Sequence, residues 1–150
     1  MSVEHQYEVT VAWNADRKGM MSASDVSTKI EVATPPQFPK GMENIWSPEH
    51  LFVAAINSCL MTTFLAIAEN SKLEFTNFSS KASGKLEMVE GKYLMTEVTL
   101  LPTVTIEKEH DKERATRILE KSEAACLISN SVKSKIILKT EVIVASLTNS

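Results

Sequence analysis

The feature that most constrains this chain is an uncharged segment at residues 51–68, which has acidic residues on either side. It is apolar on nearly every side when drawn as a helix, and a helix of that kind is buried all round. Ser47, Pro48 and Glu49 just before it are typical of a helix start, because Ser caps free amides, Pro suits the first turn and Glu complements the positive helix end. We therefore predict a central helix from Pro48 to about Asn70.

The same segment is not expected to cross a membrane. A membrane span needs about 20 strongly apolar residues with aromatic or basic anchors at its ends. This segment contains Asn57, Ser58, Thr62 and Thr63, and no Lys or Arg flanks it. The N-terminus also lacks the basic and apolar regions of a signal peptide. We predict a soluble, cytoplasmic protein that has no membrane partner.

A helix that is buried on every side needs cover from two directions. In a chain of 150 residues, one sheet covers one side of the helix, and a second copy of the chain is the simplest cover for the other. We therefore predict a two-fold homodimer in which the central helices pair.

The rest of the chain alternates between strand and helix patterns. Apolar residues at every second position predict a half-buried strand over residues 7–13. A second helix is predicted over residues 111–127, where apolar residues, Cys126 among them, recur at steps of three and four. The other predicted strands cover residues 19–24, 26–32, 75–85, 86–89, 93–106 with a break at Pro102, and 136–144. This order predicts an α+β fold, a single domain over residues 1–150 with two main helices on one face of an antiparallel-rich sheet.

Composition excludes several classes of protein. Hydrophobic residues make up 43% of the chain and charged residues 23%, which is typical of a folded globular protein rather than a disordered one. The net charge of −3 lacks the basic excess of a nucleic-acid binder, so we predict no nucleic-acid partner. The histidines are scattered and no glycine-rich phosphate loop is present, so we predict no metal and no bound cofactor.

Cys59 and Cys126 are the residues at which chemistry is expected. Two cysteines are too few for a disulfide framework of the secreted type. A free cysteine is often buried simply as a small apolar residue, and for either cysteine alone this is the favoured interpretation. A pair on the inner sides of two helices is also what peroxide reduction requires. One thiolate attacks the peroxide and becomes sulfenic acid, and the second thiol converts that acid to a disulfide.

A reactive thiol needs a lowered pKa, which a nearby cation can provide. Arg17, in a predicted turn, is the candidate cation, and its guanidinium could also hold a peroxide oxygen; a solvated turn cation is the simpler alternative. Glu49 is the candidate carboxylate that steers Arg17, and helix-start electrostatics is its alternative role. Glu49 and Cys59 are separated by about 15 Å along a straight helix. Either the helix bends between them or one participant comes from the other subunit, and of the two we expect a composite site at the dimer interface.

Two cysteine-containing blocks and one turn resemble a known family. Residues 47–59, SPEHLFVAAINSC, resemble the first cysteine signature of the OsmC/Ohr family, the osmotically inducible and organic-hydroperoxide-resistance proteins. Residues 124–131, AACLISNS, resemble its second cysteine motif, and Arg17–Gly19 resembles its N-terminal turn. The resemblance covers essentially the whole chain. It implies an intertwined α+β homodimer with a buried central helix and an active site at the subunit interface.

The resemblance also implies an activity and a role for each candidate residue. The activity is thiol-dependent reduction of organic hydroperoxides. By this resemblance Cys59 would be the peroxidatic thiolate, Cys126 the resolving thiol, and Arg17 and Glu49 the activating ion pair. No metal or cofactor is implied. A dithiol partner, such as a lipoylated protein, would return the disulfide to thiols.

Two other functions stay open beside peroxide reduction. The chain differs from the family's pattern at Leu127, where Pro is frequent, and at Asp16, which stands beside Arg17. A non-catalytic protein of the same fold could bind a small apolar ligand at the dimer interface. A structural stress protein with inert buried thiols is the third interpretation, and rapid modification of Cys59 at neutral pH would exclude it.

Overall fold

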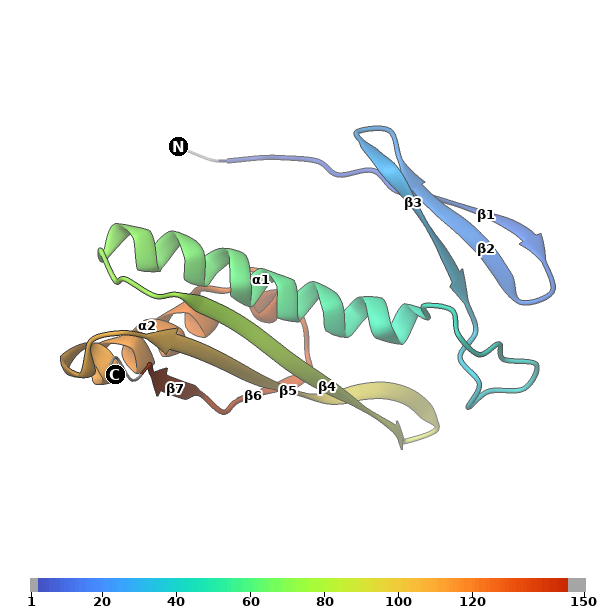
Figure 1. The fold of residues 1–150 in the computed structure, drawn as a ribbon. Coiled ribbons are helices and arrows are strands. Elements are labelled where there is room, and N and C mark those ends of the chain that lie inside the picture. The colour runs from blue at the N-terminus through green and yellow to red at the C-terminus, as the bar shows by residue number, and fades with distance from the viewer. Residues whose placement is uncertain (1–2, 146–150) are drawn as a thin grey trace. The chain divides into compact units, whose positions relative to one another are not determined.

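The computed structural model describes residues 3–145 (Figure 1). The chain divides into two compact units, which meet in sequence between Leu51 and Phe52. Each unit is described in turn. That residues 1–150 form a single domain stays a prediction.

The first unit contains a three-stranded antiparallel sheet. Its strands are β1 (Thr10–Ala15), β2 (Lys18–Ala23) and β3 (Val26–Ala33), in that order across the sheet. Three strands were predicted here, although β1 begins three residues later than expected. The predicted half-burial of the first strand is wrong within the chain, because Trp13 is 76% exposed and its neighbours on β1 are also exposed.

The start of helix α1 (Pro48–Asn70) follows the capping prediction. The His50 N–H donates to the Ser47 hydroxyl over 3.1 Å, and that hydroxyl lies 2.7 Å from Nδ1 of the same histidine. The Ser47 N–H also donates to His50 Nδ1 over 3.1 Å. The Ser47 side chain thus accepts from the His50 backbone, and the His50 side chain accepts from the Ser47 backbone, in a reciprocal cap. Both ends of α1 lie where the sequence placed them.

The second unit is built on a longer sheet. Strands β4 (Asn77–Val89) and β5 (Lys92–Ile106) form an antiparallel hairpin, and β6 (Lys135–Leu138) and β7 (Glu141–Val144) pair with β5 in parallel. Glu90 and Gly91 close the hairpin with φ values of 49° and 80°, which is the left-handed backbone that a two-residue turn requires. The two strands predicted over residues 75–89 are one continuous strand.

The sequence predicted a break in β5 at Pro102, but β5 is continuous there. Pro102 instead lies opposite the break between β6 and β7. β6 pairs with residues 97–100 of β5 and β7 with residues 103–106, so residues 139–140 lie opposite Pro102. Proline has no N–H to give to a ladder of hydrogen bonds. The single strand predicted over residues 136–144 is therefore two short strands.

Both helices pack on one face of this second sheet, as predicted. Four apolar side chains at alternate positions of β5 face the helices: Val98, Leu100, Val104 and Ile106. Ile56 and Leu60 of α1 pack on the first pair, and Phe64 of α1 packs with Leu119 of α2 (Lys112–Ala125) on the second. In Figure 1 the β4–β5 hairpin runs beside α1.

Close contacts fix α1 on β4. Asn57 of α1 donates to the Ser80 backbone carbonyl over 2.9 Å and accepts from the Ser80 hydroxyl over 2.7 Å. Further along β4, a Cβ added to Gly84 would lie 2.5 Å from the Val53 side chain. Only a glycine therefore lets the helix approach the strand this closely, and the two contacts hold the part of α1 that precedes Cys59 against β4.

The prediction that α1 is buried on every side is wrong within a single chain. Its inner face is buried, but Met61 and Leu65 on the outer face are 39% and 40% exposed. The sheet covers only one side of the helix, so the outer side has no cover from its own chain. By length and composition alone α1 could cross a membrane, as core helices of soluble proteins often could.

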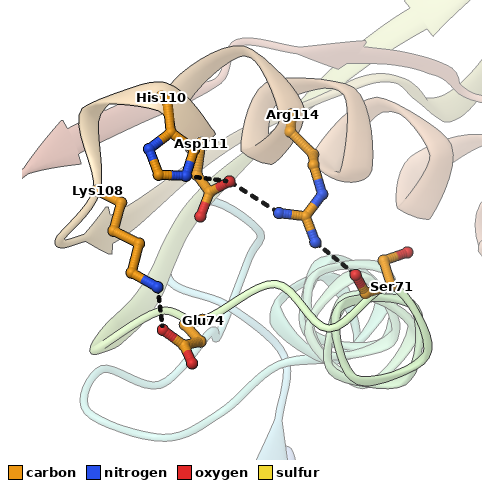
Figure 2. A network of polar contacts seen from close by, with 6 residues as sticks. All are labelled: Ser71, Glu74, Lys108, His110, Asp111 and Arg114. Carbon is orange, nitrogen blue, oxygen red and sulfur yellow. Dashed lines mark hydrogen bonds and ion pairs between the residues drawn. The ribbon is translucent and has the colours of Figure 1, made fainter.

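A polar network joins the end of α1 to the start of α2 (Figure 2). Arg114 donates to the Asp111 carboxylate over 2.9 Å and to the Ser71 carbonyl, one residue beyond α1. Asp111 is largely buried, so its charge needs this partner. Lys108 and Glu74 form a second ion pair nearby at 3.2 Å, in which both side chains are exposed. The network fixes α2 relative to α1, and so fixes the end of α2 where Cys126 follows.

Candidate active site

The second unit brings the two cysteines together. Cys59 lies near the middle of α1, and Cys126 directly follows α2 with an extended backbone (φ −66°, ψ 113°). The predicted helix extended two residues too far at its C-terminal end, because α2 ends at Ala125. Both cysteines are buried and free, and the Cys126 thiol is hydrogen-bonded to the Cys59 sulfur. The Cys126 sulfur also lies 4.0 Å from the Ile56 carbonyl of α1.

Hydrogen-bond donors converge on Cys59. Burial opposes ionisation of this thiol, but the bonds it receives outweigh burial and lower its pKa below the ordinary value. The donors are the Cys126 thiol, the Ile128 N–H, the Thr63 hydroxyl and the Leu127 N–H. Thr63 lies one helical turn after Cys59, with 3.8 Å between its oxygen and the sulfur.

The pKa of Cys126 is shifted in the opposite direction, above its ordinary value. Burial raises the pKa of its thiol, and the hydrogen bond that it gives to Cys59 raises the pKa further. The hydroxyl and N–H of Ser129 act in the other direction, since both favour a charged Cys126 sulfur. By distance and angle, however, the buried Ser129 side-chain oxygen has no hydrogen-bond partner in the part of the chain that the structure describes.

The two thiols therefore differ in how readily they ionise. Cys59 is the one that ionises first, and a thiolate is the form of cysteine that attacks electrophiles. Cys126 keeps its proton and donates it towards that thiolate. A neutral thiol in contact with a thiolate is the arrangement from which a disulfide forms once the first sulfur has been oxidised.

Arg17 and Glu49 lie in the first unit, where both line one open groove of about 790 Å³. Arg17 sits in the β1–β2 turn, whose preceding residue Asp16 has a φ of 52°. The Arg17 carbonyl accepts from the Thr34 N–H over 3.2 Å, which ties the turn to the loop after β3. Apolar side chains supply much of the remaining wall: Val11, Trp13, Val32, Ala33, Pro35 and Phe38.

Glu49 stands in the first turn of α1, where a carboxylate complements the positive helix end. One of its carboxylate oxygens, Oε1, is buried and has no hydrogen-bond partner among residues 3–145. No ion pair joins Arg17 to Glu49 within this described part of the chain. Arg17 and Glu49 thus both line the groove, but their side chains form no ion pair with each other in the described part of the chain.

Four contacts at the cysteines were missed by the sequence reasoning. Thr63 could have been found, because a hydroxyl four residues after Cys59 lies on the same helix face. Ser129 could also have been found, because it is a hydroxyl residue that closely follows Cys126 in the sequence. The N–H groups of Leu127 and Ile128 leave no trace in the sequence, since every residue except proline has one.

Metal binding has no preformed site in the described residues, where no cluster of three or more His, Cys, Asp or Glu side chains is found. That the protein uses no metal stays a prediction.

Comparison with known proteins identifies the family. The model of the family described as OsmC-like protein matches residues 39–141, which include both cysteines and the whole of α1. This chain belongs to the OsmC-like protein family. The sequence resemblance is thereby confirmed at the level of the family.

Individual relatives of the chain are distant. YmaD of Bacillus subtilis, an uncharacterised protein, is 21% identical over 143 residues, which cover 92% of this chain and 93% of YmaD. An OsmC-like protein of unknown function from Vibrio cholerae has the same fold, with a TM-score of 0.80, 24% identity, and 91% and 99% of the two chains covered. An organic hydroperoxide resistance protein from Legionella pneumophila has a TM-score of 0.76 at 20% identity, with 95% and 100% covered.

Proposed function

We propose that the protein is a cysteine-based peroxidase that reduces organic hydroperoxides. The observation that carries the proposal is the pair of buried cysteines in hydrogen-bond contact, with the pKa of Cys59 lowered and that of Cys126 raised. Family membership supports it, because the family includes organic hydroperoxide resistance proteins. The lowered pKa of Cys59 also argues against inert thiols, which ionise less readily when buried.

The proposed reaction has two steps on the protein. The Cys59 thiolate attacks the terminal peroxide oxygen, so that an S–O bond forms, the O–O bond breaks, and the alkoxide leaves and takes up a proton to become an alcohol. Cys59 is then a sulfenic acid. The Cys126 sulfur attacks the Cys59 sulfur, the S–S bond forms, and hydroxide leaves with the Cys126 proton as water. A dithiol, such as a lipoylated protein, reduces the disulfide by thiol–disulfide exchange.

Arg17 and Glu49 are proposed to form the ion pair that holds the peroxide oxygen. In support, the buried Glu49 oxygen lacks a donor among the described residues, and Arg17 lines the same groove. Buried carboxylate oxygens are nearly always hydrogen-bonded in folded proteins. The apolar wall of the groove fits an alkyl or aryl hydroperoxide better than it fits hydrogen peroxide.

We propose that the working unit is a homodimer in the cytoplasm. Each unit of the chain exposes large apolar side chains, Val11 and Trp13 on β1 and Met61 and Leu65 on α1. Groups of exposed large apolar side chains often mark protein–protein interfaces. The reaction also requires both cysteines to be reduced at rest, which the cytoplasm favours.

The deciding experiment is consumption of cumene hydroperoxide and of hydrogen peroxide by the purified protein with a dithiol reductant. We expect fast loss of the organic peroxide, no turnover by Cys59→Ser, and a single turnover by Cys126→Ser. Ser58→Ala is the matched control, because this exposed hydroxyl donates to the Ala55 carbonyl of its own helix and to no other group among residues 3–145. Full turnover by Cys59→Ser, or no peroxide loss by the unmodified protein, would refute the proposal.

The groove also favours a second candidate function, binding of a small apolar ligand without catalysis. Its volume of about 790 Å³ is that of a small-molecule site, and most of its wall is apolar. A fatty acid that raises the melting temperature of a catalytically silent protein would support this function. No shift with fatty acids, and no ligand in the native mass spectrum, would exclude it.

A further inference from the structure

Helix α1 begins with a capping box whose last position is a histidine. In a capping box the first residue is Ser or Thr, and the side chain three residues later, normally Glu or Gln, accepts a hydrogen bond from the N–H of the first. Here the two positions are Ser47 and His50, and the Ser47 N–H donates to His50 Nδ1 over 3.1 Å. The acceptor that completes the cap is therefore a ring nitrogen that can take up a proton.

The Ser47 N–H fixes which nitrogen of the His50 ring carries the proton. The Ser47 hydroxyl lies 2.7 Å from Nδ1 and can turn either to donate or to accept, but a main-chain N–H can only donate. Nδ1 must therefore present a lone pair, and the ring proton must lie on Nε2. A proton on Nδ1 would take this acceptor away from the N–H of Ser47, a fully buried residue, and a buried donor without an acceptor is costly.

No ion pair holds the His50 ring in place. The ring meets the Trp46 indole edge-on, with 5.9 Å between ring centres, and it borders an open pocket in which Glu43 is the charged residue. Glu49 precedes His50 in α1, and the α1 residues one turn later are uncharged: Val53 and Ala54. His50 forms no ion pair with Glu43, Glu49 or any other acidic residue in residues 3–145. The cap thus depends on the hydrogen bonds to Nδ1.

The cap also lies between the two polar residues of the groove. Glu49 stands between the two cap residues, in the first turn of α1. Just before the cap, the Trp46 carbonyl accepts from the Ala33 N–H over 2.8 Å. The next N–H along that strand end, that of Thr34, donates to the Arg17 carbonyl over 3.2 Å. Main-chain hydrogen bonds therefore connect the Arg17 turn to the segment that the cap holds in shape.

We propose that His50 is a positioning residue, which holds Glu49 at the groove only while its Nδ1 is free of a proton. When the ring takes up a second proton from solvent, Nδ1 becomes a donor, the cap opens, and the first turn of α1 loosens. Glu49 then leaves the position from which it would pair with Arg17. The consequence for peroxide reduction rests on the proposed function, whereas the cap itself does not.

The unsubstituted protein supplies the first test, which does not depend on the folding of a variant. The ring nitrogen resonances of His50 at neutral pH should show an unprotonated Nδ1 and a protonated Nε2. The Ser47 amide resonance should then shift on acidification along the same curve as the His50 ring. A proton on Nδ1 of the neutral ring, or an amide that does not follow the ring, would overturn the proposal.

His50→Asn and His50→Leu separate the cap from the histidine. The two new side chains have nearly the same shape, and His50 is exposed, so neither change should disturb the core. The Asn side-chain oxygen is bonded to Cγ, as Nδ1 is, so it can accept from the Ser47 N–H, and it does not titrate. Leu has no acceptor at that position.

Hydrogen exchange at the Leu51 N–H measures the cap, because this N–H donates to the Ser47 carbonyl over 3.0 Å in the first turn of α1. Its protection is the exchange rate compared with that of an unstructured peptide at the same pH. In the parent protein we expect protection to fall about fivefold as His50 takes up its proton, the factor that corresponds to the loss of one helix cap. His50→Asn should stay protected over the same range, and His50→Leu should be weakly protected at every pH. Equal curves for the parent and His50→Asn, or for the two variants, would overturn the proposal.

Peroxide reduction tests the connection to Glu49. We expect kcat/KM of the parent protein to fall, relative to that of His50→Asn, over the pH range in which His50 becomes protonated; the ionisation of Cys59 is common to both proteins and cancels in this ratio. Equal pH profiles for two active proteins would overturn the proposal.

The side-chain carboxyl resonance of Glu49 separates this proposal from the proposed function. If neither protein reduces peroxide, the proposed function fails, and this resonance decides on the role of His50. It should move with the His50 titration in the parent protein and not in His50→Asn. A resonance that behaves alike in both proteins would overturn the proposal.

Discussion

Removing the Thr63 hydroxyl should make Cys59 harder to ionise. The hydroxyl lies 3.8 Å from the sulfur and favours the thiolate. Hydrogen bonds to charged groups contribute about 1.5–3 kcal/mol, and neutral ones about 1 kcal/mol. A contact this long to a half-buried hydroxyl belongs near about 1 kcal/mol. For Thr63→Val this corresponds to about fivefold less thiolate at any pH below the midpoint, since 1.36 kcal/mol is a factor of ten.

Thr62, the residue before Thr63, provides a closely matched control. The Thr62 hydroxyl bonds the Cys59 backbone carbonyl over 3.1 Å, and not the sulfur. Thr62→Val therefore removes the same group from the same helix turn without removing a donor to the thiolate. We expect its titration curve to match that of the parent protein.

The assay follows thiolate absorbance against pH in the Cys126→Ser background. Thiolate is the charged form, so the loss of a donor raises the pKa of Cys59, and the curve for Thr63→Val should move to higher pH. Thr63→Ser keeps the hydroxyl and should restore the parent curve. The reasoning fails if Thr63→Val and Thr62→Val titrate alike, or if Thr63→Val moves the curve to lower pH.

Three further predictions concern packing and assembly. Gly84→Val should destabilise the fold by about 1–3 kcal/mol in urea unfolding, because the added side chain meets α1 and overpacks the contact; an unchanged midpoint would contradict this. Arg114→Ala should cost about 1–3 kcal/mol, because it removes a donor from the largely buried Asp111, whereas Lys108→Ala, in an exposed pair, should cost less than about 1 kcal/mol. Leu65→Glu should lower the mass measured by light scattering from dimer to monomer, because it places a charge on the proposed interface; an unchanged mass would exclude the outer face of α1 from that interface.

Much of the fold is readable from local signals in the sequence. The bounds of α1 follow from the Ser47–Pro48 start and from the polar residues after Ala68, and the structure agrees at both ends. The β4–β5 turn follows from Glu90 and Gly91, because few residues other than glycine adopt its backbone conformation. In each case the signal and the structure that it specifies lie within a few residues of each other.

The failures have a common physical origin in contacts between distant segments. Pro102 stays inside β5, and its missing N–H coincides with the break between β6 and β7 on the neighbouring side of the sheet. The sequence does not show which segments pair with β5 at that point. The apolar pattern of α1 correctly indicates burial, but it does not say whether its own chain or a second copy supplies the cover. The Cys59–Cys126 contact likewise depends on where the end of α2 meets α1, and the Arg114 network helps to set that position.

The difference in pKa between the two cysteines follows from their hydrogen bonds and not from burial. Burial raises the pKa of both thiols, so it cannot decide which of them becomes the nucleophile. Cys59 receives hydrogen bonds from two main-chain N–H groups and a hydroxyl, and also from the Cys126 thiol, which must keep its proton to give that bond. The segment that carries the proposed resolving thiol thus also helps to lower the pKa of the proposed nucleophile.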